Sequence, residues 1–148
     1  MKSVKIRDTI IGNGAKIAIQ SMLNVPTTDT GAAIDCILRL ADEGCDIIRL
    51  AVPDAAAARA MKEITAASPI PVVADIHFDY RLALACIDNG VDKIRINPGN
   101  LGGADKAAAV AKAANAAKVP IRIGINGGSL EKGLLERCGG DLALAMVE

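Results

Sequence analysis

Two kinds of hydrophobic pattern alternate along this chain. Short apolar runs rich in isoleucine and valine, such as residues 46–52 and 71–77, are typical of β-strands. Longer segments between them have apolar residues every three or four positions, as in an amphipathic helix. Strands are expected to start near Ile17, Ile47, Val72, Ile94 and Ile121. Helices are expected from a cap at Asp29 or Thr30 to Gly44, from Asp54 to Ser68, from Asp79 to Asn89, from about Ala104 to Lys118, from Ser129 to Cys138, and after Asp141.

The spacing of these strands is regular, with intervals of 30, 25, 22 and 27 residues. Such alternation predicts parallel strands joined by right-handed helical crossovers. A (β/α)8 barrel has roughly 31 residues in each unit, and an open doubly wound sheet has a similar spacing. Spacing alone therefore leaves both architectures open.

Polar residues near the strand ends favour the barrel. Barrel enzymes build their sites at the carboxyl ends of many strands, whereas an open sheet gathers its site at one switch point. In this chain the polar residues fall toward the ends of four strands: Arg49, Asp75, His77, Arg95, Asn97, Arg122 and Asn126. We therefore expect an α/β fold of the (β/α)8 TIM-barrel type, truncated to about five βα units.

A β-hairpin is expected before the first helix. Residues 4–11 alternate well enough for a strand, and Gly12-Asn13-Gly14 is a strong hairpin turn signal. The return strand is expected to run through Ile17 to residues 19–22.

Composition excludes several classes of function. Basic and acidic residues both number 17, and aromatic residues make up only 1%, so neither the basic surface nor the stacking platforms of a nucleic-acid-binding protein are expected. The sequence has no apolar run of membrane-spanning length and no secretory leader, so we expect a cytoplasmic protein with no membrane partner.

The four cysteines, Cys36, Cys45, Cys86 and Cys138, are widely scattered without a Cys-x-x-Cys pair. Metal sites usually use closely spaced ligands. We expect small buried hydrophobic residues instead, with Cys36 and Cys86 on helices.

Three arginines are the strongest chemical feature. Arg49, Arg95 and Arg122 each lie within a strand between isoleucine or leucine neighbours, so their side chains are expected to face away from the helices. Planar, permanently charged guanidinium groups suit a phosphate or diphosphate. The alternative is an internal ion-pair network, for example with Asp75.

Glycine-rich segments follow two of these strands, at residues 99–103 and 127–129. Each leads into a helix start, where backbone N–H groups can bind phosphate. This signal is meaningful only beside the arginines, because glycine is common in such loops.

Asp75 and His77 share one face of their strand. As the only histidine, His77 is the one side chain that normally titrates near neutral pH, so it is a candidate proton or hydrogen-bond donor oriented by Asp75. A structural role is the alternative for a lone histidine. Gln20 and Asn24, at the end of the first barrel strand, are expected to offer neutral hydrogen bonds to a ligand.

Five segments carry a resemblance to a known family. They are IQSM at 19–22, VADIHFDYR at 73–81, RINPGN at 95–100, IRIGIN at 121–126 and GSLEK at 128–132. In this order they closely resemble the hydroxymethylbutenyl diphosphate synthase family, and the resemblance covers essentially the whole chain.

The resemblance implies a function. Members of that family convert 2-C-methyl-D-erythritol 2,4-cyclodiphosphate to 4-hydroxy-3-methylbut-2-enyl diphosphate in non-mevalonate isoprenoid biosynthesis. The reaction is a two-electron reductive ring opening at a [4Fe-4S] cluster, with flavodoxin or ferredoxin as electron donor, in a homodimer. The resemblance assigns diphosphate binding to Arg49, Arg95 and Arg122, with Asn97, Asn126 and Gln20 nearby, and catalytic positions to Asp75 and His77.

By the same resemblance, residues 1–148 form the N-terminal part of the barrel, and a C-terminal iron–sulfur domain is absent from this chain. Three cysteines and a glutamate hold the cluster there, and none of the four cysteines here matches a ligand. The chain alone is therefore expected to hold no iron and to be inactive, with its open sheet edge covered by another copy. The alternatives are a dihydropteroate-synthase-like barrel and a non-catalytic fragment or assembly module.

Overall fold

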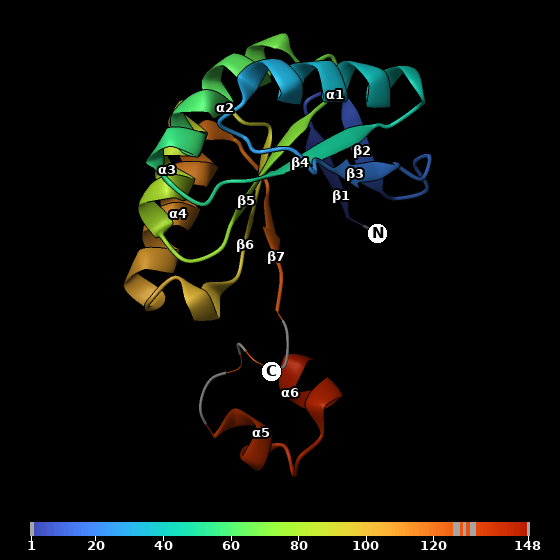
Figure 1. Ribbon diagram of the computed structural model, residues 1–148. Helices are drawn as coiled ribbons and strands as arrows, with labels where there is room; N and C mark the ends of the chain where they lie inside the picture. Colours follow the sequence, from blue (N-terminus) through green and yellow to red (C-terminus); the bar gives the residue numbers. More distant parts are fainter. Residues whose placement is uncertain (1, 126–127, 129, 131–132, 148) are drawn as a thin grey trace.

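A computed structural model describes residues 2–125, 128, 130 and 133–147. Its centre is a five-stranded parallel sheet with helices packed on one face (Figure 1). The strands pair in the order in which they occur in the chain: β3 Gln20–Met22, β4 Ile47–Ala51, β5 Val72–Ile76, β6 Lys93–Ile96 and β7 Ile121–Ile123. A doubly wound sheet reverses its strand order at a switch point, and this sheet does not. The expected barrel-type fold is therefore confirmed.

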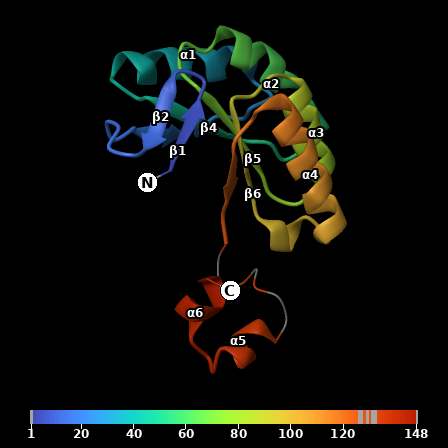
Figure 2. The same ribbon diagram turned by 180° about the vertical axis from the view of Figure 1, so that it is seen from behind.

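Four helices lie side by side over one face of the sheet (Figures 1 and 2). They are α1 Thr30–Asp42, α2 Ala55–Ala67, α3 Tyr80–Asp88 and α4 Ala104–Ala117. The first three begin as predicted, because Asp29, Asp54 and Asp79 each accept a hydrogen bond from a backbone N–H of the first turn. Gly44 and Gly90, in the left-handed region, follow α1 and α3.

The main hydrophobic core lies between the sheet and these helices. Alternate strand residues such as Ile48, Leu50, Val72, Ile76 and Ile94 have no more than 1% of their surface exposed. They pack against fully buried helix residues, which include Ile37, Met61, Ile64, Cys86 and Val110.

The expected position of the hairpin is wrong. Strands β1 Ser3–Ile6 and β2 Thr9–Gly12 pair with each other through a turn at Arg7 and Asp8, so the Gly-Asn-Gly signal begins at the last residue of β2 and does not join the two strands. Ile17, which was expected in the return strand, is 87% exposed, and β3 pairs in parallel with β4 instead.

Tertiary contacts of Arg7 account for this difference. Arg7 has a left-handed φ of 50°, and its guanidinium donates to the carbonyls of Ser68, at 2.9 Å, and Ile70. The same guanidinium forms an ion pair of 3.1 Å with Asp92. The turn therefore forms where Arg7 reaches the amino ends of the strands, and Gly12 and Asn13 make a later turn that only ends β2.

The hairpin closes the amino end of the second sheet face, the one without helices. Ile6 of β1 is fully buried and packs against Ile47 and Val73, which point to that face. This leaves the carboxyl half of the same face to the polar side chains.

Two short helices, α5 Leu134–Arg137 and α6 Leu142–Val147, follow β7 and lie apart from the helical layer (Figure 1). The expected helix start at Ser129 lies outside the described residues. Gly139 and Gly140 follow α5 with positive φ, and Asp141 accepts a hydrogen bond from the Leu144 N–H, both as expected.

Candidate anion-binding site

The strand register lines up charged residues across the sheet. Asp75 of β5 is paired with Arg95 of β6, and Arg95 is paired with Arg122 of β7. Because side chains alternate along a strand, all three point away from the face that holds Ile76 and Ile94. Arg49 lies on this second face too, two residues before Ala51, the partner of Asp75 on β4. The expected convergence of these side chains on one face is confirmed.

Asp75 is the centre of the cluster and is only 2% exposed. Arg95 Nη1 donates to one carboxylate oxygen of Asp75 at 3.2 Å. Arg49 Nε lies 3.3 Å from the other oxygen, and His77 Nε2 lies 3.9 Å from it. The ion-pair network considered from the sequence is therefore present, and it holds two guanidinium groups side by side.

Arg49 is incompletely satisfied in this network. Its Nε is buried, and among the described residues it finds no acceptor in hydrogen-bond geometry, although the Asp75 carboxylate is close. Its Nη2 donates to the Met22 sulfur, at 3.1 Å, which is a weak acceptor. A thioether is a poor partner for a charged N–H, so the exposed Nη2 end of Arg49 is suited to receive a further anionic partner.

A fourth cation, Lys93, was missed by our sequence reasoning. Lys93 pairs with Val73, lies on the same face as Arg95 two residues later, and is only 9% exposed. Burial, and then the charge of Arg122, lower the pKa of its ammonium. The signal was present in the sequence, because the alternation that places Arg95 on this face also places Lys93 there.

The charges of this face do not balance. Strands β4 to β7 direct four cations to it, from Arg49, Lys93, Arg95 and Arg122, but Asp75 is the only carboxylate that they direct there. A concave barrel face with excess positive charge favours an anion. The paired positions of Arg95 and Arg122 can present two guanidinium groups to the same phosphate group.

The remaining predicted site residues lie around this cluster. The His77 side chain is 44% exposed at the end of β5, next to Phe78, and Gln20 is exposed on β3. Asn97 is 2% exposed, and its side-chain oxygen accepts from the Gly99 N–H at 3.2 Å, so it caps the short helix η1 Pro98–Asn100. Asn126 lies outside the described residues. The ligand-binding roles of these residues stay predictions.

The glycine-rich segment after β6 gives little support for a phosphate cradle. Asp105 lies in the first turn of α4, and a side chain added at Gly103 would meet its carboxylate oxygen at 2.7 Å. A carboxylate therefore already stands at this helix start, where it repels an anion. The second segment, residues 127–129, is described only at Gly128.

The cysteines do not form a cluster-binding set. All four are free, and burial raises the pKa of the Cys86 thiol to about 12. Among residues 2–125, 128, 130 and 133–147, no three histidine, cysteine or acidic side chains come close enough to hold a metal ion. These residues do not fit an iron–sulfur cluster, and its absence from this chain stays a prediction.

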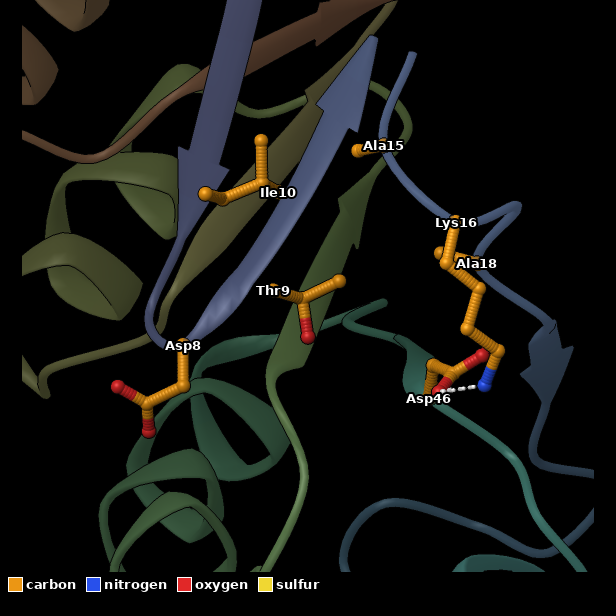
Figure 3. Close-up of a pocket in the computed structure, with 7 residues that line it drawn as sticks. All are labelled: Asp8, Thr9, Ile10, Ala15, Lys16, Ala18 and Asp46. Carbon is orange, nitrogen blue, oxygen red and sulfur yellow. Dashed lines mark hydrogen bonds and ion pairs between the residues drawn. The ribbon is translucent and has the colours of Figure 1, made fainter.

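A pocket beside the hairpin lies at the other end of the strands (Figure 3). Thr9 and Ile10 of β2 line it, together with Lys16 and Asp46, which form an ion pair of 3.4 Å. Asp46 directly precedes β4, so this pocket is at the amino end of the sheet, where barrels place stabilising rather than catalytic residues. We therefore do not take it as the functional site.

Within the described part of the chain, every helix is too short or too polar to cross a membrane.

Comparison with known proteins agrees with the resemblance seen in the sequence. The family model described as "GcpE TIM-barrel domain" matches residues 1–148. A 4-hydroxy-3-methylbut-2-en-1-yl diphosphate synthase (flavodoxin) from Ruminiclostridium cellulolyticum is 52% identical over 147 residues, which are 99% of this chain and 42% of that protein. The protein of the same name from Maridesulfovibrio salexigens is 54% identical over 146 residues, or 97% of this chain and 40% of that protein. The chain thus spans about two-fifths of the length of these relatives.

Solved structures with the same arrangement are more distant in sequence. Dihydropteroate synthase from Stenotrophomonas maltophilia has a TM-score of 0.62 at 18% identity, covering 99% of this chain and 59% of that one. Dihydropteroate synthase from Xanthomonas albilineans has a TM-score of 0.65 at 14% identity, covering 98% and 60%. At this level of identity the likeness establishes a shared fold and does not favour a pterin-binding function.

Proposed function

The chain belongs to the GcpE TIM-barrel domain family, and from this we propose that it is the diphosphate-binding part of an enzyme that forms 4-hydroxy-3-methylbut-2-enyl diphosphate. The substrate in this proposal is 2-C-methyl-D-erythritol 2,4-cyclodiphosphate, whose ring is opened with two electrons. The names of the relatives support flavodoxin as the electron donor. We assign the [4Fe-4S] cluster to another part of the protein.

The observation that carries the proposal is the excess of positive charge around a single buried carboxylate. Arg95 and Arg122 stand next to each other in register, and Arg49 Nη2 donates to the weakly accepting Met22 sulfur. A cyclic diphosphate carries two adjacent phosphate groups, which can accept from several guanidinium groups at once. Asp75 holds Arg49 and Arg95 in place before the ligand arrives, so less ordering is required on binding.

Polar residues around the cluster take the positioning roles in this proposal. His77, beside Asp75 at the strand end, donates a hydrogen bond or a proton to a substrate oxygen. Gln20, Asn97 and Asn126 contact the phosphate and hydroxyl oxygens. A second copy of the chain completes the molecule as a homodimer.

Titration calorimetry of the full-length protein with inorganic pyrophosphate tests the proposal. Charge-assisted hydrogen bonds contribute roughly 1.5–3 kcal/mol, so Arg95→Ala and Arg122→Ala are each expected to weaken binding about tenfold or more. Arg59→Ala, on the exposed surface of α2, is the matched control and should bind like the parent. Parental affinity in both site variants would overturn the proposal.

A further inference from the structure

Gly124, the first residue after β7, has an unusually close neighbour. A Cβ atom built at this position would lie 2.6 Å from both Nε and Nη2 of Arg95, and 2.9 Å from its Cζ. Carbon and nitrogen atoms in favourable contact are separated by about 3.5 Å or more. A side chain at position 124 and the observed position of the Arg95 guanidinium therefore exclude each other.

Backbone conformation does not explain the glycine. Gly124 is not among the described residues with positive φ, so its conformation is one that other residues adopt. Its N–H donates to the Ile96 carbonyl at 2.9 Å, which continues the β6–β7 pairing and fixes the backbone beside Arg95. What distinguishes Gly124 is the space left by its missing side chain, which the Arg95 guanidinium occupies.

We propose that Gly124 is a positioning residue, whose missing side chain determines where the Arg95 guanidinium stands and thus how this face binds a phosphate group. The guanidinium is held on one side by Asp75, at 3.2 Å, and rests on the other side against the backbone at Gly124. A methyl group at position 124 occupies the place of the guanidinium, which has no room to retreat toward Asp75 and must swing aside to another side-chain rotamer, away from Asp75. The part of this inference that concerns phosphate rests on the proposed function.

The fold should survive such a change. The atoms that an added Cβ would meet belong to the end of a long, flexible side chain that is 21% exposed, and not to backbone. Arg95 can therefore move aside while the sheet remains intact, which separates the positioning role from a role in stability.

The test compares Gly124→Ala, Arg95→Ala and their double variant in the full-length protein. We expect Gly124→Ala to melt within a few degrees of the parent and to bind pyrophosphate at least tenfold more weakly in calorimetry. The double variant should bind no more weakly than Arg95→Ala, because both changes remove the same contact. Gly31→Ala is the matched control, since an added Cβ there meets only Asp29, at 3.9 Å, and it should bind like the parent.

A crystal structure of Gly124→Ala gives a readout that does not depend on the ligand. The Arg95 guanidinium should be displaced, and its contact with Asp75 lost. An unmoved guanidinium, parental affinity, or effects of the two variants that simply add would overturn the inference. If Arg95→Ala and Arg122→Ala both leave pyrophosphate binding unchanged while the guanidinium moves as expected in Gly124→Ala, the proposed function fails, and only the positioning of Arg95 by Gly124 stands.

Discussion

Strands β5 and β6 present two faces that are almost equally buried and chemically opposite. Toward the helices they direct Ile76 and Ile94, both fully buried. Away from the helices they direct Asp75, which is 2% exposed, and Lys93, which is 9% exposed. Burial therefore does not decide which residues are apolar here. One face stabilises the fold by filling space, and the other holds charges whose partners and positions matter individually.

Removing volume from the helix-facing side should have the largest effect. Ile94→Ala leaves a cavity among fully buried neighbours and should lower the free energy of unfolding by about 3 kcal/mol. Urea denaturation measures this loss. Ile17→Ala, at an 87% exposed position, is the control and should change stability by less than about 0.5 kcal/mol. A loss below about 1 kcal/mol for Ile94→Ala would show that this face is loosely packed.

Removing the charge of Asp75 should lower the stability by a smaller amount, and a bound anion should offset the loss. Asp75→Asn leaves Arg49 and Arg95 without their shared carboxylate, and should lower stability by about 1–2 kcal/mol, because both arginines are partly exposed to water. Added sulfate should then stabilise the variant more than the parent, since the anion takes the place of the carboxylate. Equal stabilisation of both proteins, measured by thermal melts across a sulfate series, would contradict this reading of the cluster.

Lys93→Met should raise the stability of the fold and at the same time weaken anion binding. Removing a buried ammonium stabilises the fold by about 1 kcal/mol at neutral pH, and it weakens pyrophosphate binding. Because the pKa of Lys93 is lowered in the folded state, the penalty of its charge is present at low pH. The penalty shrinks as pH rises through the folded pKa and is gone above the ordinary value of 10.5, so the advantage of the variant should disappear there.

Urea denaturation of the parent and Lys93→Met at pH 7 and above pH 10.5 measures this difference. An advantage that is unchanged between the two conditions would mean that packing, and not charge, causes it.

Removing a carboxylate that lies on neither face of the sheet should have the smallest effect on stability. Asp54 caps α2 by accepting from the Ala57 N–H at 2.8 Å, and Asp54→Ala should lower stability by about 0.5–1 kcal/mol. Asp54→Asn keeps a capping oxygen and is the control. Unlike Asp75→Asn, the alanine variant should gain nothing extra from sulfate in thermal melts. A sulfate response like that of Asp75→Asn would remove the distinction between the two carboxylates.

Much of the fold follows from local signals in the sequence. The caps at Asp29, Asp54 and Asp79 predict the helix starts because capping is a contact within one helical turn. The hairpin could not be placed in this way. Its turn at Arg7 is stabilised by Ser68 and Asp92, which are far along the chain, whereas the Gly-Asn-Gly signal was only the strongest local alternative.

In the site, too, features set by local sequence pattern could be predicted, and features set by contacts between distant residues could not. Strand alternation predicted that Arg49, Asp75 and Arg95 share a face, and the structure confirms it. Lys93 followed from the same rule but was overlooked, because a lysine at the start of a strand resembles a solvent-exposed end. The role proposed for Gly124 could not be predicted, since it depends on where a side chain from the neighbouring strand comes to rest.

The order of the strands also bears on how the chain reaches its fold. Each strand of the five-stranded sheet pairs with its sequence neighbours, and paired residues are only 20 to 27 positions apart. Such short loops close quickly, so the sheet can grow one strand at a time as the chain leaves the ribosome. The hairpin cannot pack against the sheet in this order of synthesis, because the carbonyls that Arg7 binds, those of Ser68 and Ile70, lie 61 and 63 residues later in the chain. The segment that is synthesised first therefore takes its place only after β3 and β4 have been made.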